Sequence, residues 1–218
     1  MTPELVIFDC DGVLIDSERL AVRVEGEILA RLGWPLSREE IIERFVGRSS
    51  AYMRAEIEAQ IGRPVNWAEE FQRHYDAVYE IELQVVPGID AVLDGLTVPT
   101  CVASSSTHRS LRRNLGLVGL FERFEGRIFS AEDVVHGKPA PDLFLYAARQ
   151  MGVAPERCVV VEDAPAGVTG ARAAGMTVLG FTDGLHGEAP LLAAGAIPFA
   201  RMSDLLNLLG ALSSADEL

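Results

Sequence analysis

Short apolar runs recur along the chain and are rich in β-branched residues, which is the pattern of buried parallel strands. They are ELVIF (4–8), VPTCVAS (98–104), RIF (127–129), RCVVV (157–161) and TVLGF (177–181). Amphipathic segments typical of helices lie before three of them, at 87–96, 141–152 and 164–175. Strands that alternate with helices predict an α/β fold built on a doubly wound parallel sheet.

The stretch between the first two strands has a different pattern. Apolar residues recur every four positions over 20–32, which predicts a helix that ends at Gly33. Ser37 with Glu40 has the spacing of a helix-capping box, and the pair at 66 and 69 has the same spacing before a later helix. This stretch is therefore expected to be helical throughout.

The length of this helical stretch determines the expected domain organisation. A crossover between parallel strands requires one helix, and residues 18–84 are long enough for several. We expect a helical domain at 18–84, inserted into an α/β core domain formed by 1–17 and 85–218. A chain of 218 residues is long enough for one full domain that carries a smaller insertion.

Composition limits the possible partners and the location. The chain is 49% hydrophobic with a formal net charge of −13, so we expect no nucleic-acid partner and no membrane partner. Cys10, Cys101 and Cys158 lie in or beside apolar runs and are expected to be core thiols. With no apolar run of membrane-spanning length and no export signal in MTPELVIFD, we expect a reducing, cytoplasmic location. The sequence does not indicate the oligomeric state.

Candidate chemistry falls at the carboxyl ends of the strands, where open α/β sheets bind their ligands. Those ends carry Asp9 and Asp11 after the first strand, Ser104 at the second, Lys138 after the third, and Glu162 and Asp163 after the fourth. Two like charges about 4 Å apart repel by roughly 4 kcal/mol at a surface-like dielectric, so converging carboxylates need protons or a cation. Oxygen ligands favour a hard ion, above all Mg²⁺.

Each of these features also has an ordinary alternative when taken singly. The pair at 11 and 12 fits a turn, Ser104 to Ser106 fit a helix cap, and the pair at 162 and 163 fits the start of a solvated loop. Lys138 is the only lysine in a chain whose other strong cations are arginines, which composition alone could produce. Their occurrence at successive strand ends favours one shared site.

Four segments, in order and spanning nearly the whole chain, resemble the motifs of the haloacid dehalogenase-like hydrolase superfamily. They are DCDGVLIDS (9–17), VASSS (102–106), GKPAPD (137–142) and VVVEDAPAGVTGARAAG (159–175). The helical insertion resembles the C1 cap of that superfamily, in the branch that contains phosphoglycolate phosphatase, sugar-phosphate phosphatases and β-phosphoglucomutase.

The resemblance implies a role for each motif residue. Asp9 would attack phosphorus to give an aspartyl-phosphate, and Asp11 would protonate the leaving alcohol and later deprotonate the hydrolytic water. Ser104 would donate a hydrogen bond to a phosphoryl oxygen, and Lys138 would lie between that oxygen and Asp9. The implied Mg²⁺ ligands are Asp9, the backbone carbonyl of Asp11, Glu162 and Asp163.

The activity expected from this resemblance is hydrolysis of a small phosphorylated metabolite. A sugar or sugar-acid phosphate, such as a phosphogluconate-like or phosphoglycolate-like compound, is the expected substrate class. Candidates for contacting the rest of the substrate are Arg48, Ser105, Ser106, Thr107 and His108. Thr107 also fits a helix cap, and Arg48 also fits an ordinary surface arginine.

Two alternatives are weighed against the hydrolase. A sugar phosphomutase of the β-phosphoglucomutase type typically carries a His and an Arg where this chain has Ala21 and Ser50, which disfavours it. A phosphoreceiver signalling domain shares the acid cluster, hydroxyl and lysine. It places the phosphorylated Asp after its third strand and lacks a helical insertion, so it is the more remote alternative.

Overall fold

The structure is a computed structural model that describes residues 2–46 and 50–214. Its residues separate into two compact units, Met1–Ile15 with Val85–Leu218 and Asp16–Gln84. The first is an α/β unit, and the second contains helices and no strand among its described residues. That the helical unit acts as a cap stays a prediction.

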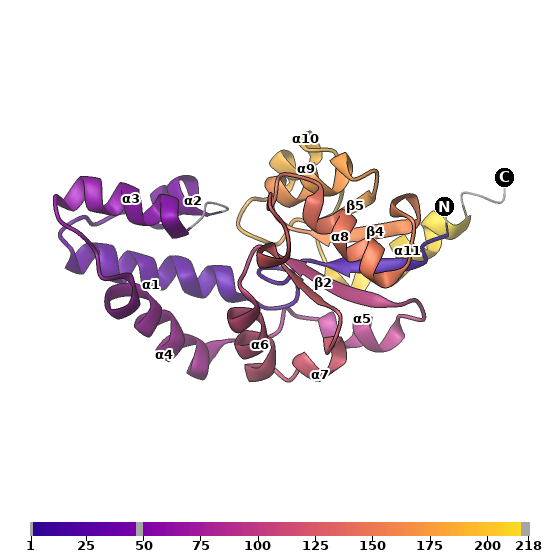
Figure 1. Ribbon diagram of the computed structural model, residues 1–218, viewed down its shortest axis with the longest axis horizontal. Coiled ribbons are helices and arrows are strands. Elements are labelled where there is room, and N and C mark those ends of the chain that lie inside the picture. The colour runs from indigo at the N-terminus through magenta and orange to yellow at the C-terminus, as the bar shows by residue number, and fades with distance from the viewer. Residues whose placement is uncertain (1, 47–49, 215–218) are drawn as a thin grey trace. The chain divides into compact units, whose positions relative to one another are not determined.

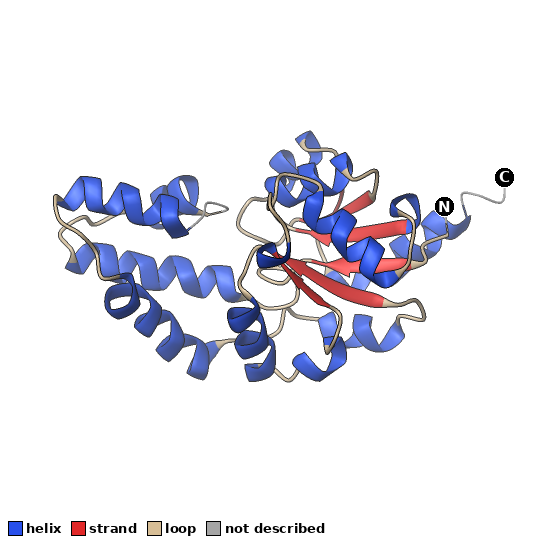
Figure 2. Ribbon diagram, in the orientation of Figure 1, coloured by secondary structure: helices blue, strands red, loops and turns tan. Residues whose placement is uncertain are grey.

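The α/β unit is built on a six-stranded sheet whose paired strands are all parallel, in the order β3-β2-β1-β4-β5-β6 (Figures 1 and 2). The strands are β1 Leu5–Phe8, β2 Thr100–Ser104, β3 Ile128–Ser130, β4 Cys158–Glu162, β5 Thr177–Phe181 and β6 Ile197–Phe199. The chain starts in the middle of the sheet and builds outward in both directions. This confirms the doubly wound parallel sheet expected from the sequence.

Helices lie between the strands of this unit and after the last one. They are α5 Ile89–Gly95, α6 His108–Leu117, α7 Phe121–Phe124, α8 Asp142–Met151, α9 Pro165–Ala173, α10 Glu188–Ala193 and α11 Leu205–Ser214. Short 3₁₀ turns lie at Ala131–Asp133, Pro155–Arg157 and Met202–Asp204. Helix α8 ends at Gly152, whose φ of 70° is the left-handed conformation that glycine adopts without strain.

Strand β1 lies between β2 and β4, and all four of its residues are buried because helices pack on both faces of the sheet. On one face, Leu5 and Ile7 belong to a core cluster that includes residues of α8 and α9. On the other, the Phe8 ring packs edge-to-face on Phe124 of α7, with centroids 6.5 Å apart. The continuous apolar run therefore reflects a central strand with two covered faces, and its last residue delivers Asp9 to the carboxyl edge.

The helical unit contains α1 Ser17–Arg31, α2 Arg38–Phe45, α3 Ser50–Ile61 and α4 Arg73–Glu82, with a π-helical turn, Ala68–Gln72, before α4. The capping box at Ser37 is confirmed, since its hydroxyl accepts from the Glu40 amide and the Glu40 carboxylate accepts from the Ser37 amide. The second expected box is wrong by one residue, because the Asn66 amide donates to Glu70. The wider π-helical turn that follows places the later side chain within reach.

One strand was not expected from the sequence. Strand β6 has three residues, includes Pro198 and forms an edge of the sheet, where a missing backbone donor is tolerated. Cys10, Cys101 and Cys158 are buried free thiols, as expected. Among the described residues, no helix combines the length and the apolar character needed to cross a bilayer.

Candidate active site

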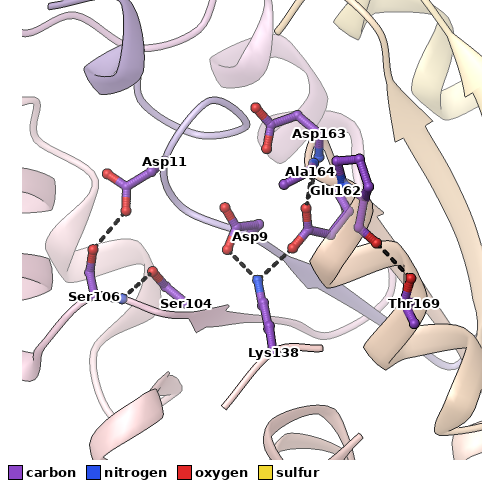
Figure 3. Close-up of polar contacts among 10 residues, drawn as sticks. Asp9, Asp11, Ser104, Ser106, Lys138, Glu162, Asp163, Ala164 and Thr169 are labelled. Atoms are coloured by element: carbon purple, nitrogen blue, oxygen red, sulfur yellow. Dashed lines mark hydrogen bonds and ion pairs between the residues drawn. The ribbon is translucent and has the colours of Figure 1, made fainter. Parts of the chain in front are cut away.

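Residues from four strand ends meet at the carboxyl edge of the sheet (Figure 3). Asp9 directly follows β1, Ser104 ends β2 and Glu162 ends β4. Lys138 comes from the loop between the 3₁₀ turn after β3 and α8. Parallel strands bring their carboxyl ends to one edge, so residues 129 positions apart in sequence can lie in contact.

Lys138 joins two carboxylates with one ammonium group. Its Nζ lies 2.5 Å from Asp9 Oδ1 and 2.5 Å from Glu162 Oε1. The lysine side chain is only 6% exposed and its nitrogen lies 5.1 Å from the centre of the Phe144 ring. The ammonium is thus fixed by charge on two sides and by an aromatic face on a third.

The Glu162 carboxylate is held from both of its oxygens. Oε1 accepts a hydrogen bond from the Lys138 ammonium. Oε2 accepts hydrogen bonds from the backbone N–H groups of Asp163 and Ala164, each at 2.9 Å. These amides lie just before α9, which begins at Pro165, where unpaired helix N–H groups favour an anion. The orientation of Glu162 is therefore set by the strand-to-helix turn.

Two glycines leave room for these carboxylates. A Cβ built on Gly167 would lie 1.7 Å from Glu162 Oε1, and one on Gly12 would lie 2.1 Å from Asp163 Oδ2. Gly12 also has a φ of 83°, a backbone angle that residues other than glycine rarely adopt. Any larger residue at either position would displace a carboxylate of the cluster.

Three acidic side chains form a buried group of oxygen donors. One carboxylate oxygen each from Asp9, Glu162 and Asp163 can be chosen so that all lie within 4.8 Å of one another. The three residues are 7%, 1% and 1% exposed, respectively. Against three carboxylates stands the single ammonium of Lys138, so the fully ionised cluster has a surplus of two negative charges.

Burial and the neighbouring charges shift the pKa values of Asp9 and Lys138. Burial raises the pKa of Asp9 from 3.8 to about 7; Lys138 opposes the rise, and Glu162 and Asp11 add to it. For Lys138, burial alone would lower the pKa, but Asp9 and Glu162 reverse this and hold it above its usual value. Lys138 therefore stays charged, and the cluster holds more negative charge than one ammonium balances.

Asp11 lies apart from the three clustered carboxylates. Its Oδ2 accepts a hydrogen bond from Ser106 Oγ at 2.8 Å, and the Ser106 amide donates to Ser104 Oγ at 3.0 Å (Figure 3). Ser104 is fully buried. The predicted hydroxyl of the second motif and the second aspartate of the first motif are thus linked through Ser106.

The other residues expected to contact substrate have different surroundings. Thr107 caps α6, since its hydroxyl accepts from the Ser110 amide at 3.2 Å, which fits the alternative given above. The ring of His108 lies 2.9 Å from Asp133, and its amide donates to Glu132. Ser105 is exposed, and Arg48 lies outside the described residues. Their contact with substrate stays a prediction.

A residue that the sequence analysis missed is Ser130, the last residue of β3. It is fully buried, and its hydroxyl donates to the Ser106 carbonyl at 2.7 Å. Its position in the sequence could have indicated this residue, because Ser130 ends a strand as Ser104 does. The two serines are paired in register. A serine followed by acidic residues also reads as a turn cap, a role that Ser130 fills as well.

Comparison with known proteins agrees with this fold. Residues 3–175 match the family described as haloacid dehalogenase-like hydrolases, and the chain belongs to that family. The 6-phosphogluconate phosphatase of Escherichia coli (strain K12) is 29% identical over 94% of this chain and 94% of its own length. Within the family, the chain falls in the phosphatase branch.

Solved structures show the same architecture. A conserved haloacid dehalogenase-like protein of unknown function from Agrobacterium tumefaciens str. C58 has a TM-score of 0.86 and 39% identity, covering 97% of this chain and 99% of its own. A candidate β-phosphoglucomutase from Thermotoga maritima has a TM-score of 0.80 and 26% identity, with 95% and 99% coverage. The fold of this chain is therefore shared by a haloacid dehalogenase-like protein and by a candidate mutase.

Proposed function

We propose that the protein is a Mg²⁺-dependent phosphomonoester hydrolase that acts on a small phosphorylated metabolite through an aspartyl-phosphate at Asp9. The observation that carries this proposal is Lys138, whose one ammonium lies between Asp9 and Glu162 in a cluster that has two surplus negative charges when fully ionised. An anionic nucleophile beside a cation is the arrangement needed to attack a phosphate dianion.

The donor set suits a hard divalent cation. Asp9, Glu162 and Asp163 are buried and offer only oxygen, and when all three are ionised beside Lys138 their surplus negative charge equals the charge of one such ion. We propose that these three side chains and the Asp11 carbonyl hold Mg²⁺, which when bound would offset the repulsion between carboxylate and phosphate.

Asp9, Asp11 and Ser104 would carry out the remaining chemical steps. A carboxylate oxygen of Asp9 would attack phosphorus while the bond to the leaving alcohol breaks, and Asp11 would give its proton to the departing oxygen. Asp11 would then take a proton from the water that hydrolyses the acyl phosphate. Ser104 accepts the Ser106 amide, which leaves its own hydroxyl proton for a phosphoryl oxygen.

The proposed substrate class is a sugar or sugar-acid phosphate. It is supported by the similarity to a protein named 6-phosphogluconate phosphatase, which extends over nearly the full length of both chains. Cytoplasmic location remains an expectation from the free cysteines.

A sugar phosphomutase is the second candidate, because a candidate β-phosphoglucomutase shares the fold. Ala21 and Ser50 stand where mutases of this type carry a His and an Arg, and Ser50 is exposed at the start of α3. A hydrolase is therefore the preferred reading. The phosphoreceiver alternative is set aside, since the chain belongs to the hydrolase family and Asp9 follows the first strand.

The test is a screen of phosphorylated sugars and sugar acids that measures inorganic phosphate and remaining sugar phosphates together. With Mg²⁺ we expect phosphate release, and with excess EDTA a loss of at least about a hundredfold, or roughly 2.7 kcal/mol of barrier. Asp9→Asn is the inactive control. Full activity in EDTA would refute the metal dependence, and rapid isomerisation of a hexose 1-phosphate with its bisphosphate, without phosphate release, would make the mutase correct.

A further inference from the structure

Ser130 is a buried polar residue that the proposed mechanism does not use. A buried hydroxyl without a partner is unfavourable, so its hydrogen bonds show what the residue does. Ser130 Oγ donates to the Ser106 carbonyl at 2.7 Å and accepts from the Glu132 amide at 3.1 Å. The first bond leads toward Asp11 and the second only caps a turn.

Ser106 is tied on both sides of its backbone. Its amide donates to Ser104 Oγ and its carbonyl accepts from Ser130, so both peptide groups that flank its Cα are fixed. With that backbone fixed, the direction of the Ser106 side chain is restricted to a few rotamers. In the observed rotamer its hydroxyl donates to Asp11 Oδ2 at 2.8 Å (Figure 3).

Further contacts join the loop after β2 to the turn after β3. His108 donates its amide to Glu132 at 2.8 Å, and its ring lies 2.9 Å from Asp133 Oδ1. The other oxygen of Asp133 accepts the Ser130 amide at 2.8 Å. His108 and Asp133 therefore hold the two loops together, and the Ser130 hydroxyl is the member of this group that reaches Ser106.

We propose that Ser130 is a positioning residue for Asp11, and that through Ser106 it keeps the Asp11 carboxyl aimed at the leaving oxygen of the substrate. This inference rests on the proposed phosphatase function. Ser130 itself touches no reacting atom, because its hydroxyl ends on a backbone carbonyl. Its effect should therefore appear only where the proton from Asp11 is needed.

Substrates with different leaving groups separate this role from a structural one. An alkyl phosphate releases a strongly basic alkoxide, which needs a proton as the P–O bond breaks, whereas p-nitrophenyl phosphate releases a phenolate that leaves unaided. The quantity to compare is kcat/KM, which reports the first irreversible step and so the phosphorylation of Asp9. General damage to the site would lower both values alike.

Ser130→Ala is expected to lower kcat/KM for the alkyl phosphate at least about tenfold, with a loss under about threefold for p-nitrophenyl phosphate. Asp11→Asn should show the same selectivity with larger losses. In the Asp11→Asn background, Ser130→Ala should lower kcat/KM for the alkyl phosphate almost no further, because Ser130 acts through Asp11.

Other variants protect the test from misfolding. Ser106→Ala removes the donor to Asp11 from a partly exposed loop and should reproduce the same selectivity. Ser130→Thr keeps the hydroxyl and should restore most of the alkyl-phosphate activity. Thr169→Ala removes another hydroxyl-to-carbonyl bond, 2.8 Å to Pro165, and should leave the ratio of the two kcat/KM values unchanged.

Equal losses for both substrates in Ser130→Ala and Ser106→Ala, or full additivity with Asp11→Asn, would overturn the positioning role while the phosphatase function stands. A wild-type protein that hydrolyses neither substrate would refute the proposed function, and this inference would fall with it.

Discussion

Lys138 shows how strongly a single residue type can be specified by its surroundings. Its nitrogen lies 2.5 Å from each of two carboxylates, and its side chain is almost fully buried. An ammonium is a compact charge on a thin chain, whereas a guanidinium is a wide planar fork with five donors. Since protein interiors are close-packed, the space between Asp9 and Glu162 suits the first and not the second.

Lys138→Arg should therefore keep the charge and lose the activity. We expect kcat to fall at least about a hundredfold, or roughly 2.7 kcal/mol, because the wider head group displaces Asp9 or Glu162. The measurement is phosphate release under saturating substrate, with circular dichroism to verify folding. Arg149→Lys on the neighbouring α8 is a matched exchange on the protein surface and should have little effect. Near-normal activity in Lys138→Arg would show that composition alone explains the single lysine.

At this scale the sequence predicts which residues meet and fails to predict their hydrogen bonds. Asp9, Lys138 and Glu162 could be predicted because each follows a recognisable buried strand at a known edge of the sheet. The contact between the His108 ring and Asp133 could not be predicted, since it depends on how two loops fold against each other. Ser130 was missed because a turn cap and a buried donor have the same sequence pattern.

Among the elements, α1 and α4 meet around a buried acid. Glu25 on α1 is 8% exposed, and Tyr75 on α4 donates its hydroxyl to Glu25 Oε1 at 2.8 Å. Burial raises the pKa of Glu25 from 4.5 to about 7, although the hydrogen bond from Tyr75 opposes the rise. The folded helical unit thus binds a proton that the unfolded chain releases at a lower pH.

Glu25→Gln should remove a pH-dependent loss of stability. Because the pKa of Glu25 is higher in the folded state, the folded wild type keeps its full stability below pH 4.5. It loses stability as the pH rises toward about 7. Gln stays neutral and can still accept from Tyr75, so at pH 8 the variant should be more stable by up to roughly 3 kcal/mol. Urea unfolding at pH 5 and pH 8 measures the difference, with the exposed Glu27→Gln as control. An equal effect of Glu25→Gln at both pH values would contradict this account.

Elements were predictable where several signals agreed. The strands β1, β4 and β5 combine buried apolar runs with a following turn or loop, and all three were expected from the sequence. Strand β6 has three residues and a proline, so its pairing with β5 is decided by tertiary packing. In the helical unit, the π-helical turn shifted a capping interaction from Glu69 to Glu70, which no residue pattern signals.

At the scale of the molecule, the fold concentrates negative charge where the chain already carries a net charge of −13. Three carboxylates from β1 and β4 are buried at one edge of the sheet, and one ammonium faces them. Sheet topology, which places β1 beside β4, forces these like charges together. Without a further cation, this edge should destabilise the α/β unit.

The last prediction is that Mg²⁺ and Asp163→Asn act on stability in opposite ways. In EDTA, Asp163→Asn should melt at or above the wild type, because it removes one of three clustered charges. With Mg²⁺ at about one hundred times its Kd, the wild type should gain roughly 2.7 kcal/mol. For a chain of this length, that gain corresponds to about 5–10 °C in Tm. The variant should gain much less, so the order of the two Tm values reverses.

Asp90→Asn, an exposed change on α5, should shift with Mg²⁺ as the wild type does. A wild type that melts at the same temperature with and without Mg²⁺ would show that these carboxylates are balanced by protons and not by a metal ion.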